Sequence, residues 1–243
     1  MTKIFIIAHK PVDYGLWNDE LYTPIQVGNA PDIQEGILRD NTGDNISDWN
    51  KYFAETTATY WISKHVTGCT YLGQCQYRRR LELHDADFDQ IFKQYDAICC
   101  QSLRYNPYSQ FAGCHARGDA DDLCEAIRTL YPDMAESVDR YLVHGNILYY
   151  SNGYVLRAQD YKAYADFLYN VQRYIIDKRG YTSIEELERQ VTEEINCGYR
   201  RGNRGLRYQE QIGGFASERA FTCWVQHHCP RRLEIKYKKY EGI

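Results

Sequence analysis

The sequence predicts an α/β fold, a single domain whose mostly parallel central sheet is flanked by helices. The chain has 243 residues, a length that one domain with one core can accommodate. Its first segment, 3–8, is a continuous apolar run, which is typical of a central parallel strand buried on both faces. A segment of helical periodicity separates this run from the strand that begins at Tyr71, as in a strand–helix–strand unit. No internal repeat, low-complexity tract or linker divides the chain.

The elements of the N-terminal half follow from apolar periodicity and turn residues. Strands are expected at 3–8, 22–28, from 71 onward and at 95–100. Asn45 is the expected N-cap of a helix that runs to about Val66, with Asp48 as its capping-box partner. The free N–H groups of such a helix start attract phosphate or ribose oxygens. Asp44 and Asn45 would serve this role, capping, or both.

The C-terminal half is predicted to be mainly helical. Residues 101–118 have the composition of a loop, and a strand–turn–strand is expected over 147–156. The arginine- and glycine-rich segment 198–207 is interpreted as a mobile basic loop that either clamps phosphate or is solvated. Gly213-Gly214 introduces the last helix. The earlier helices are expected at about 119–130, 133–143, 161–178 and 182–196.

Charge and composition exclude several classes of protein. The formal net charge of −4 and the pI near 6.0 argue against nucleic-acid binding, which usually requires a basic excess. Nine cysteines without a Cys-x-x-Cys pair do not fit a zinc site, and their odd number indicates reduced thiols in the cytosol. The apolar run 4–8 is too short for an export signal. No run approaches the roughly twenty apolar residues of a transmembrane helix.

The stretch from Tyr71 to Leu81 carries the most informative chemistry. It starts as a strand and ends in a run of arginines. A planar guanidinium pairs with two oxygens at once and keeps its charge, so arginine is well matched to a diphosphate. Ligands of α/β sheets lie beyond the carboxyl ends of the strands, where Tyr77, Arg78 and Arg79 would meet a nucleotide-sugar. A basic strand end in a surface ion-pair network is the alternative explanation.

Asp85 and Asp87 form an Asp-x-Asp pair, a spacing found in many metal sites. Such a pair normally follows an apolar strand directly, whereas this one precedes Phe88, Ile91 and Phe92 at helical spacing. N-capping of a helix explains the aspartates better. The sequence therefore assigns no metal ligand, and Mn²⁺ or Mg²⁺ stays open as a cofactor.

Four ordered motifs resemble one protein family. The run Cys75-Gln76-Tyr77-Arg78-Arg79 is similar to the Cys-His-Tyr-Arg-Arg signature of the domain-of-unknown-function 4422 family. Gln76 replaces the family's usual histidine, which puts in question any role of that position as acid, base or metal ligand. The other matches are His9-Lys10-Pro11, Asn41-Thr42-Gly43-Asp44-Asn45-Ile46-Ser47 and Gly214-Phe215-Ala216-Ser217-Glu218-Arg219.

This resemblance implies a glycosyltransferase of bacterial capsule, exopolysaccharide or O-antigen biosynthesis, with a GT-A-like fold. Residues from 1 to about 105 would form the nucleotide-binding half, and residues from about 106 to 243 the half for acceptor and sugar. The residues implied to bind the donor are His9, Lys10, Asp44, Asn45, Gln76, Tyr77, Asn152 and Arg219. Asn152 would hydrogen-bond a sugar hydroxyl, or it would only form a turn.

The resemblance also implies catalytic roles. Arg78 and Arg79, helped by Arg201 or Arg204, would stabilise the leaving diphosphate. Glu218 would be the carboxylate base that accepts the proton of the acceptor hydroxyl. Its alternative role is that of a carboxylate at a helix start, stabilised by the helix dipole.

The implied partners are a UDP-sugar donor, of the UDP-galactose or UDP-galactofuranose type, and a saccharide acceptor for which a lipid-linked form is one option. No nucleic acid is among them. The implied location is the cytoplasm, with peripheral contact at the inner membrane face as an option. The basic segment 231–240 would suit anionic lipid, although an edge strand protected by lysines explains it better. The alternative function is a non-catalytic nucleotide- or carbohydrate-binding component of a polysaccharide assembly complex, which needs no poised carboxylate.

Overall fold

A β-sheet forms the centre of the molecule. The computed structural model describes residues 1–29 and 32–240 of the chain. The strands are β1 (Thr2–Ala8), β2 (Tyr22–Gln26), β3 (Leu38–Arg39), β4 (Tyr71–Gln76), β5 (Arg79–Leu81), β6 (Ala97–Cys100), β7 (Tyr154–Arg157), β8 (Arg232–Ile235) and β9 (Tyr237–Lys239). Their order is β3-β2-β1-β4-β7-β6-β8, and β5 pairs with both β4 and β9. The predicted α/β fold with a central sheet is therefore confirmed.

Strand β1 lies in the interior of the sheet, as its apolar sequence predicts. It pairs in parallel with β2 on one side and with β4 on the other. Successive side chains point to opposite faces of a strand. Phe5 and Ile7 accordingly join one apolar cluster, while Ile4 and Ile6 join a second cluster on the opposite face.

Three strands, β5, β7 and β9, depart from the prediction of a mostly parallel sheet, because each pairs antiparallel with its neighbours. Strand β7 is antiparallel to both of its neighbours, β4 and β6, so the sheet is mixed. Strands β6 and β8 are again parallel to each other. The chain enters β7 from the turn at 151–153, at the edge where β4 ends, and must therefore run back through the sheet.

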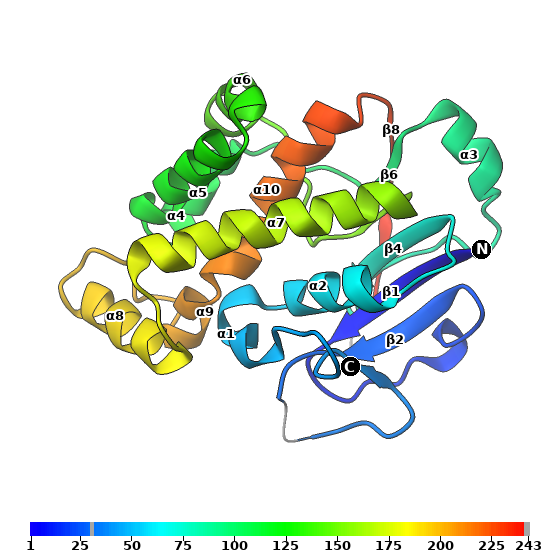
Figure 1. Ribbon diagram of the computed structural model, residues 1–243, viewed down its shortest axis with the longest axis horizontal. Coiled ribbons are helices and arrows are strands. Elements are labelled where there is room, and N and C mark those ends of the chain that lie inside the picture. Colours follow the sequence, from blue (N-terminus) through cyan, green and yellow to red (C-terminus); the bar gives the residue numbers. More distant parts are fainter. Residues whose placement is uncertain (30–31, 241–243) are drawn as a thin grey trace.

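Helices flank the sheet, and the long helices pack against one another (Figure 1). The α-helices are α1 (Asn50–Phe53), α2 (Thr56–His65), α3 (Phe88–Gln94), α4 (Pro107–Cys114), α5 (Arg117–Leu130), α6 (Ala135–Ser137), α7 (Ala158–Arg179), α8 (Ile184–Asn196), α9 (Leu206–Glu210) and α10 (Ile212–His228). Shorter helical turns are η1 (Gly15–Trp17), η2 (Ser47–Trp49), η3 (Pro132–Met134) and the π-helical segment η4 (Val138–Val143). No helix of the described residues is both long and apolar enough to cross a membrane.

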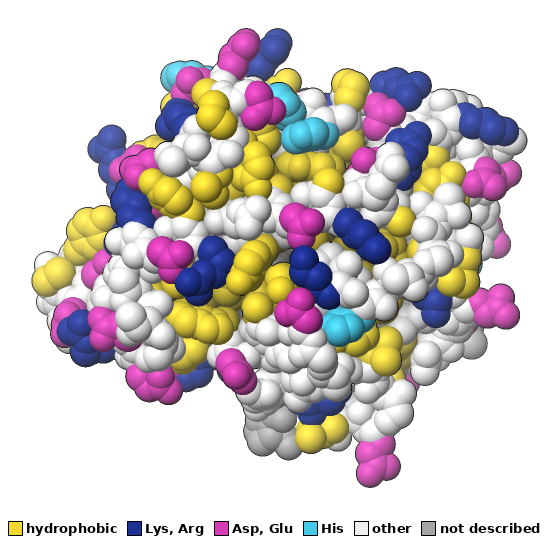
Figure 2. Space-filling model, in the orientation of Figure 1, with side chains coloured by type: hydrophobic (Ala, Val, Ile, Leu, Met, Phe, Trp, Pro, Cys, Tyr) yellow, Lys and Arg dark blue, Asp and Glu magenta, His cyan; other side chains and the backbone are white. Residues whose placement is uncertain are grey.

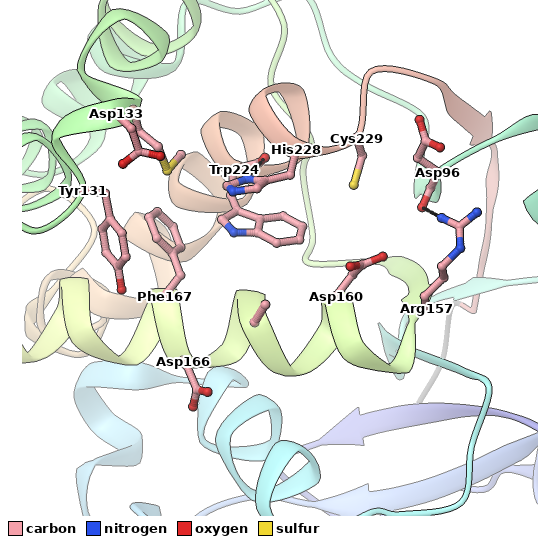
Figure 3. A pocket seen from close by; sticks show the side chains of 12 residues that line it. Asp96, Tyr131, Asp133, Arg157, Asp160, Asp166, Phe167, Trp224, His228 and Cys229 are labelled. Atoms are coloured by element: carbon pink, nitrogen blue, oxygen red, sulfur yellow. Dashed lines mark hydrogen bonds between the residues drawn. The ribbon is translucent and has the colours of Figure 1, made fainter.

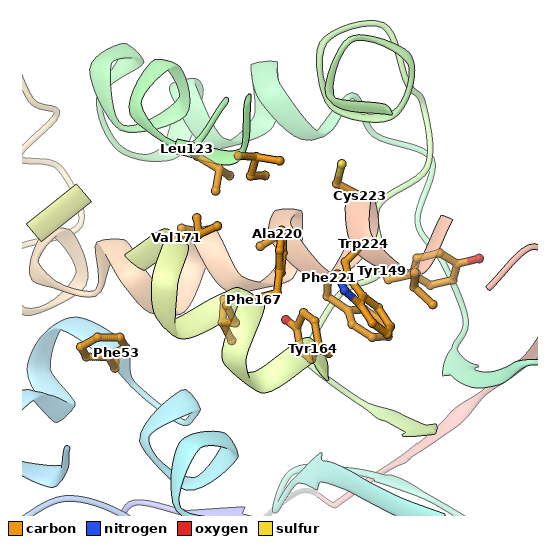
Figure 4. Close-up of a cluster of buried hydrophobic side chains, with 14 of the residues drawn as sticks. Phe53, Leu123, Tyr149, Tyr164, Phe167, Val171, Ala220, Phe221, Cys223 and Trp224 are labelled. Carbon is orange, nitrogen blue, oxygen red and sulfur yellow. The ribbon is translucent and has the colours of Figure 1, made fainter. Parts of the chain in front are cut away.

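The larger apolar cluster fills the space between α5, α7, α10 and the sheet (Figure 4). Phe221 of α10 stacks on Tyr154 of β7, with ring centroids 4.3 Å apart, and meets Tyr164 of α7 edge-on at 5.2 Å. Aromatic pairs in these geometries add about 0.5–1.5 kcal/mol to the stabilisation from burial alone. Many tyrosines of the chain therefore serve the core.

Both charge signs are interspersed on the face shown in Figure 2, where lysine and arginine side chains alternate with aspartate and glutamate. No continuous basic stripe crosses this face. The basic side chains on this face are therefore dispersed among acidic ones.

The helix predicted from Asn45 to Val66 is wrong as a single element. The chain forms η2, α1 and α2 in succession, and it breaks at Ala54, where φ is 51° and ψ is −133°. Asn45 lies before the first turn and accepts a hydrogen bond from the Ser47 N–H, while Asp48 accepts one from Asn29 instead of closing a capping box. The predicted helix start with free N–H groups for phosphate is therefore not formed at Asn45.

Two further expectations need correction. Residues 101–118 contain α4, whose N-cap Asn106 accepts a hydrogen bond from Ser109 N–H at 2.7 Å and is followed by a proline, a common first helical residue. The last helix, α10, begins at Ile212, so Gly213 and Gly214 lie inside it. These glycines allow close approach, because a Cβ on Gly213 would lie 2.5 Å from the ring of Tyr52.

The sheet topology marks one edge as a ligand site. Strands β1, β2 and β3 extend the sheet in one direction, whereas β4 lies on the other side of β1. In open α/β sheets, ligands bind beyond the carboxyl ends of the strands where the order reverses in this way. The switch lies between β1 and β4, which end at Ala8 and Gln76.

Candidate functional site

A cavity of about 210 Å³ lies at the predicted place, beyond the carboxyl ends of β1, β2 and β4. We call it the arginine cavity. Residues directly after three parallel strands contribute to it, and the chain around α1 and α9 closes it from the side. Its lining includes His9, Val27, Asn50, Ala54, Glu55, Gln76, Tyr77, Arg78, Arg79, Arg207 and Gln211. Five of the sequence-predicted residues, His9 and 76–79, therefore come together.

Cationic side chains dominate this cavity. Arg78 and Arg79 reach it from the β4–β5 hairpin, and Arg207 reaches it from α9. Burial of the His9 ring, together with the charges of Arg207, Arg78 and Lys10, lowers the pKa of His9. His9 is thus neutral at pH 7, and its ring meets Tyr77 edge-on at 5.5 Å. The cavity presents three permanent cations, a neutral imidazole and one carboxylate, that of Glu55, and this excess of positive charge suits an anion.

The three consecutive arginines have different surroundings, because the chain turns back at Tyr77-Arg78 and β5 pairs antiparallel with β4. Arg78 is exposed toward the cavity. Arg79 is half-buried, packs on the ring of Tyr150 at 5.0 Å and donates to Gln76 Oε1 at 2.8 Å. Arg80 is 1% exposed and lies 4.2 Å from the ring centroid of Tyr240, so it has a structural role at the chain's C-terminal end.

A second, smaller cavity of about 120 Å³ adjoins the first and is lined by two carboxylates. We call it the carboxylate cavity. Glu55 and Glu218 face it together with the aromatic residues Tyr150 and Phe215. The residues that line both cavities are Ala54, Glu55, Gln76 and Gln211. The site therefore combines a cationic compartment with an acidic compartment, and Glu55 and Gln76 lie at their junction.

Glu218 lies in the interior of α10, two turns after its first residue, and is 6% exposed. Its Oε1 accepts from Ser151 N–H at 2.8 Å, and its Oε2 accepts from Arg219 Nη1 at 2.6 Å. Burial raises its pKa to about 7, partly offset by Arg219 and reinforced by the charge of Glu55. The expected position at a helix start is wrong, so the helix dipole does not explain this carboxylate.

Glu55 is the residue of this site that the sequence did not indicate. It follows the backbone break at Ala54 and accepts from Gln76 Nε2 at 2.7 Å and from Asn152 Nδ2 at 3.0 Å. A non-glycine residue at positive φ stores strain of about 1–3 kcal/mol and is often found at functional sites. The regular spacing of Trp49, Phe53 and Tyr60 concealed the break, which only tertiary contacts reveal.

Asn152 and Arg219 lie beneath the cavity instead of lining it. Asn152 is 2% exposed, has φ of 47°, and uses its amide group for Glu55 and for Ser217 Oγ at 2.8 Å. Its neighbour Ser151 also has positive φ, 71°, which turns its N–H toward Glu218. Arg219 is 1% exposed and forms an ion pair with Glu218. The contacts of Asn152 and Arg219 thus hold the two carboxylates in place.

The remaining predicted donor residues are not brought to the two cavities. Lys10 follows His9 but does not line either one. Asp44 accepts a hydrogen bond from Tyr60 OH at 3.0 Å, on the outer side of α2. Next to it, the side chain of Asn45 accepts one from Ser47 N–H. The buried acidic residue of this loop is Asp40, which accepts from Gly28 N–H at 2.9 Å.

The basic segment 198–207 is more structured than its composition predicts. Arg200 is fully buried and forms a bidentate pair with Asp119 at 2.6 and 2.9 Å, so it is not available to a phosphate. Arg204 donates to Tyr208 OH at 2.8 Å, outside both cavities. Arg207 is the arginine of this segment that reaches the arginine cavity.

The Asp-x-Asp pair does not fit a metal site at this edge. Asp87 caps α3 by accepting from Gln90 N–H at 3.0 Å, as predicted. Helix α3 lies at the opposite edge of the sheet, where Asp89 accepts from the hydroxyl of Tyr71 at the start of β4. Within residues 1–29 and 32–240, no three histidine, cysteine or acidic side chains converge on one point.

Two larger cavities lie outside this pair. An outer cavity of about 1120 Å³ continues from the arginine cavity past His9 and Arg207 toward Trp49, α8 and Glu210. Another, of about 490 Å³, lies at the opposite edge between α7 and the end of α10 (Figure 3). Its lining includes Asp160, Trp224 and His228 but none of the sequence-predicted site residues.

The comparisons with known proteins agree with this fold. The structure is similar to the apo structure of the WbbM bifunctional glycosyltransferase, with a TM-score of 0.69 and 19% sequence identity. The match covers 99% of this chain and 45% of that one, so this chain spans less than half the length of that protein. No curated protein matches the sequence. The model of the family described as "Domain of unknown function (DUF4422)" matches residues 3–229, and the chain belongs to this family.

Proposed function

We propose that this protein is a glycosyltransferase that moves a sugar from a nucleotide-sugar to the hydroxyl group of a saccharide acceptor. One observation carries the proposal: an arginine-lined cavity at the topological switch point adjoins a cavity with two carboxylates. Glycosyl transfer needs cations at the leaving diphosphate and a base at the attacking hydroxyl, a few ångströms apart. The glycosyltransferase fold of the structural neighbour supports the same assignment.

The donor diphosphate would lie in the arginine cavity. Arg78 and Arg79 of the β4–β5 hairpin and Arg207 of α9 all line it. Guanidinium groups pair with two phosphate oxygens at once, so they stabilise the negative charge that grows as the sugar leaves. The nucleoside would extend into the outer cavity, past the neutral ring of His9. In this proposal the half formed by 1–105 would supply His9, Arg78 and Arg79, and residues 182–210 of the other half would complete the nucleotide site.

Glu218 would be the base. The acceptor hydroxyl loses its proton to the carboxylate as its oxygen bonds to the anomeric carbon, and the bond from that carbon to the diphosphate oxygen breaks. A pKa near 7 suits this role, because a base works best when its pKa is close to the operating pH. Tyr150 and Phe215 offer apolar surface to an acceptor sugar in the same cavity. No step of this scheme is assigned to a metal ion.

The finer assignments come from the resemblance of the four motifs. On that ground the donor is a UDP-sugar of the galactose or galactofuranose type, and the pathway is bacterial surface polysaccharide synthesis. The acceptor would then be a saccharide, lipid-linked in one form of the proposal, reached from the cytoplasmic side of the inner membrane. The similar WbbM protein is itself described as a bifunctional glycosyltransferase.

Calorimetry with uridine nucleotides, followed by a turnover assay, tests the proposal. We expect UDP and at least one UDP-sugar to bind the wild-type protein, with or without Mn²⁺. Arg78→Ala should weaken that binding, whereas Arg201→Ala, outside both cavities, should not. Absence of uridine nucleotide binding would contradict the proposal. Binding without turnover on any saccharide acceptor would favour the non-catalytic component of an assembly complex.

A further inference from the structure

The reacting groups of a glycosyl transfer must lie in a fixed order. If the proposed function holds, Glu55 lies where that order puts the transferred sugar. The anomeric carbon belongs to both the breaking bond and the forming bond. The transferred sugar must therefore lie between the diphosphate and the hydroxyl held by the base. Those two groups are assigned to adjoining cavities, and the acidic side chain common to both linings is that of Glu55.

The contacts of Glu55 leave one oxygen available at this junction. Its Oε1 accepts from Gln76 Nε2 and from Asn152 Nδ2, at 2.7 and 3.0 Å. Among the described residues, no donor lies within hydrogen-bond distance of Oε2. The side chain is half-buried, in contrast to Glu218, which is 6% exposed and has protein donors on both oxygens.

We infer that Glu55 holds the transferred sugar, accepting hydrogen bonds from its hydroxyl groups through Oε2, and so takes part in selecting the donor. A carboxylate fixed at one oxygen and free at the other is a strong, directed acceptor. Sites that hydrogen-bond a substrate hydroxyl discriminate strongly against analogues that lack it, because the buried acceptor is then left unpaired.

Gln76 gives Glu55 its orientation. Arg79 Nη1 donates to Gln76 Oε1, and Gln76 Nε2 donates to Glu55. Because a guanidinium only donates and a carboxylate only accepts, the amide of Gln76 has one satisfying orientation. A neutral histidine, with one accepting and one donating nitrogen, can form the same two bonds. Gln76 is thus a positioning residue, which links Arg79, a cation of the proposed diphosphate site, to the sugar-binding carboxylate of Glu55.

The test compares UDP with a UDP-sugar. The probe is the tightest binder among UDP-galactose, UDP-galactofuranose, UDP-glucose and UDP-N-acetylglucosamine for the wild-type protein, measured by calorimetry beside UDP. In Glu55→Gln we expect UDP affinity within about twofold of wild type and UDP-sugar affinity at least about tenfold lower, because charge-assisted hydrogen bonds to the sugar are lost. Asp177→Asn, in an exposed ion pair on α7, is the matched control and should change neither.

Three further variants extend the test. Glu55→Asp keeps the charge but withdraws the carboxylate, so it should also lose sugar affinity selectively. Gln76→His should retain the wild-type preference for the UDP-sugar over UDP, whereas Gln76→Leu should lose it. Equal losses for UDP and UDP-sugar, or an unchanged UDP-sugar affinity in both Glu55 variants, would overturn the inference alone. A wild-type protein that binds no uridine nucleotide would remove the proposed function and this inference with it.

Discussion

Gly214 of α10 packs directly against Ala54, and a Cβ added to Gly214 would lie 2.7 Å from the Cβ of Ala54. Real Cβ atoms essentially never come this close. Ala54 is the residue at which the helix breaks, with φ of 51°, and Glu55 follows it. The contact therefore supports the strained backbone that presents Glu55 to both cavities.

Substituting Gly214 with alanine tests this support. Overpacking at a site without free space typically costs about 1–3 kcal/mol, and here the backbone before Glu55 must move to relieve the contact. We expect Gly214→Ala to lower stability by this amount in urea unfolding and to reduce UDP-sugar affinity. Gly113→Ala, an exposed helix position in α4 where a Cβ meets nothing within 4 Å, should be neutral or stabilise by about 0.5–1 kcal/mol. Equal effects of the two substitutions would show that the contact with Ala54 is unimportant.

Sequence patterns predicted the parts of this molecule that depend on local periodicity. The apolar run 3–8 is a central strand, and the expected helices 119–130, 161–178 and 182–196 correspond to α5, α7 and α8. Polar residues after β1 and β4 come together because parallel strands end at one edge of a sheet. Tyr77, Arg78 and Arg79 were predicted in this way, whereas His9 and Gln76 were predicted from the resemblance of the motifs.

Sequence patterns could not predict features that arise from contacts between distant segments. The break at Ala54 depends on the approach of α10, and the burial of Arg200 depends on Asp119, 81 positions away. Local composition suggested a regular helix in the first case and a solvated loop in the second. Glu55 was missed for the same reason, since its partners Gln76 and Asn152 are distant in sequence.

The buried pair of Arg200 with Asp119 should be important for stability. Both side chains are at most 2% exposed, and Glu194 also contacts Arg200 at 2.8 Å. Removing one partner of a buried pair leaves an uncompensated charge and typically costs about 3–5 kcal/mol. We expect this loss for Arg200→Met in urea unfolding. The exposed neighbour variant Arg201→Met should stay within about 0.5 kcal/mol of wild type. A small effect of Arg200→Met would favour the mobile loop predicted from composition.

Replacing both aspartates of the Asp-x-Asp pair should leave the site chemistry unchanged. Asp87 caps α3 at the opposite edge of the sheet, so the double variant Asp85→Ala with Asp87→Ala should cost about 0.5–2 kcal/mol of stability. Uridine nucleotide affinity and its response to added Mn²⁺ should match wild type in calorimetry. A Mn²⁺-dependent affinity that disappears in the folded double variant would show that this pair binds metal.

Arg78→Lys should slow the chemical step although the charge is kept. Lysine cannot reproduce the planar fork that pairs with two phosphate oxygens. Losing one preorganised donor to a developing charge typically costs on the order of a hundredfold in rate. Single-turnover rates with a saturating UDP-sugar measure this effect. Arg80→Lys, buried under Tyr240, should instead mainly lower the melting temperature. An unchanged rate in Arg78→Lys would mean that Arg78 contributes charge alone or does not contact the diphosphate.

Glu218→Gln separates the role of base from the role of a buried structural carboxylate. If Glu218 is the base, donor affinity should stay nearly constant while turnover falls by at least about a hundredfold, because the interaction acts only in the transition state. The glutamine keeps an acceptor oxygen for Ser151 N–H but turns its amide NH2 toward Arg219, so the melting temperature is measured on the same sample as turnover.

The pH dependence of this variant provides an independent check, because burial raises the pKa of Glu218 from 4.5 to about 7. The carboxylate must be ionised to accept a proton, so wild-type kcat/KM should rise with pH to a plateau above about 7. The protonated form is the one that the fold favours. The stabilisation of the folded state by protonated Glu218 is fully present below pH 4.5 and is lost as the pH rises through about 7. Wild type should therefore lose stability relative to Glu218→Gln over this interval, in urea unfolding at pH 5 and pH 8. A fully active Glu218→Gln protein would exclude Glu218 as the base and leave Glu55 as the carboxylate of the site to test for that role.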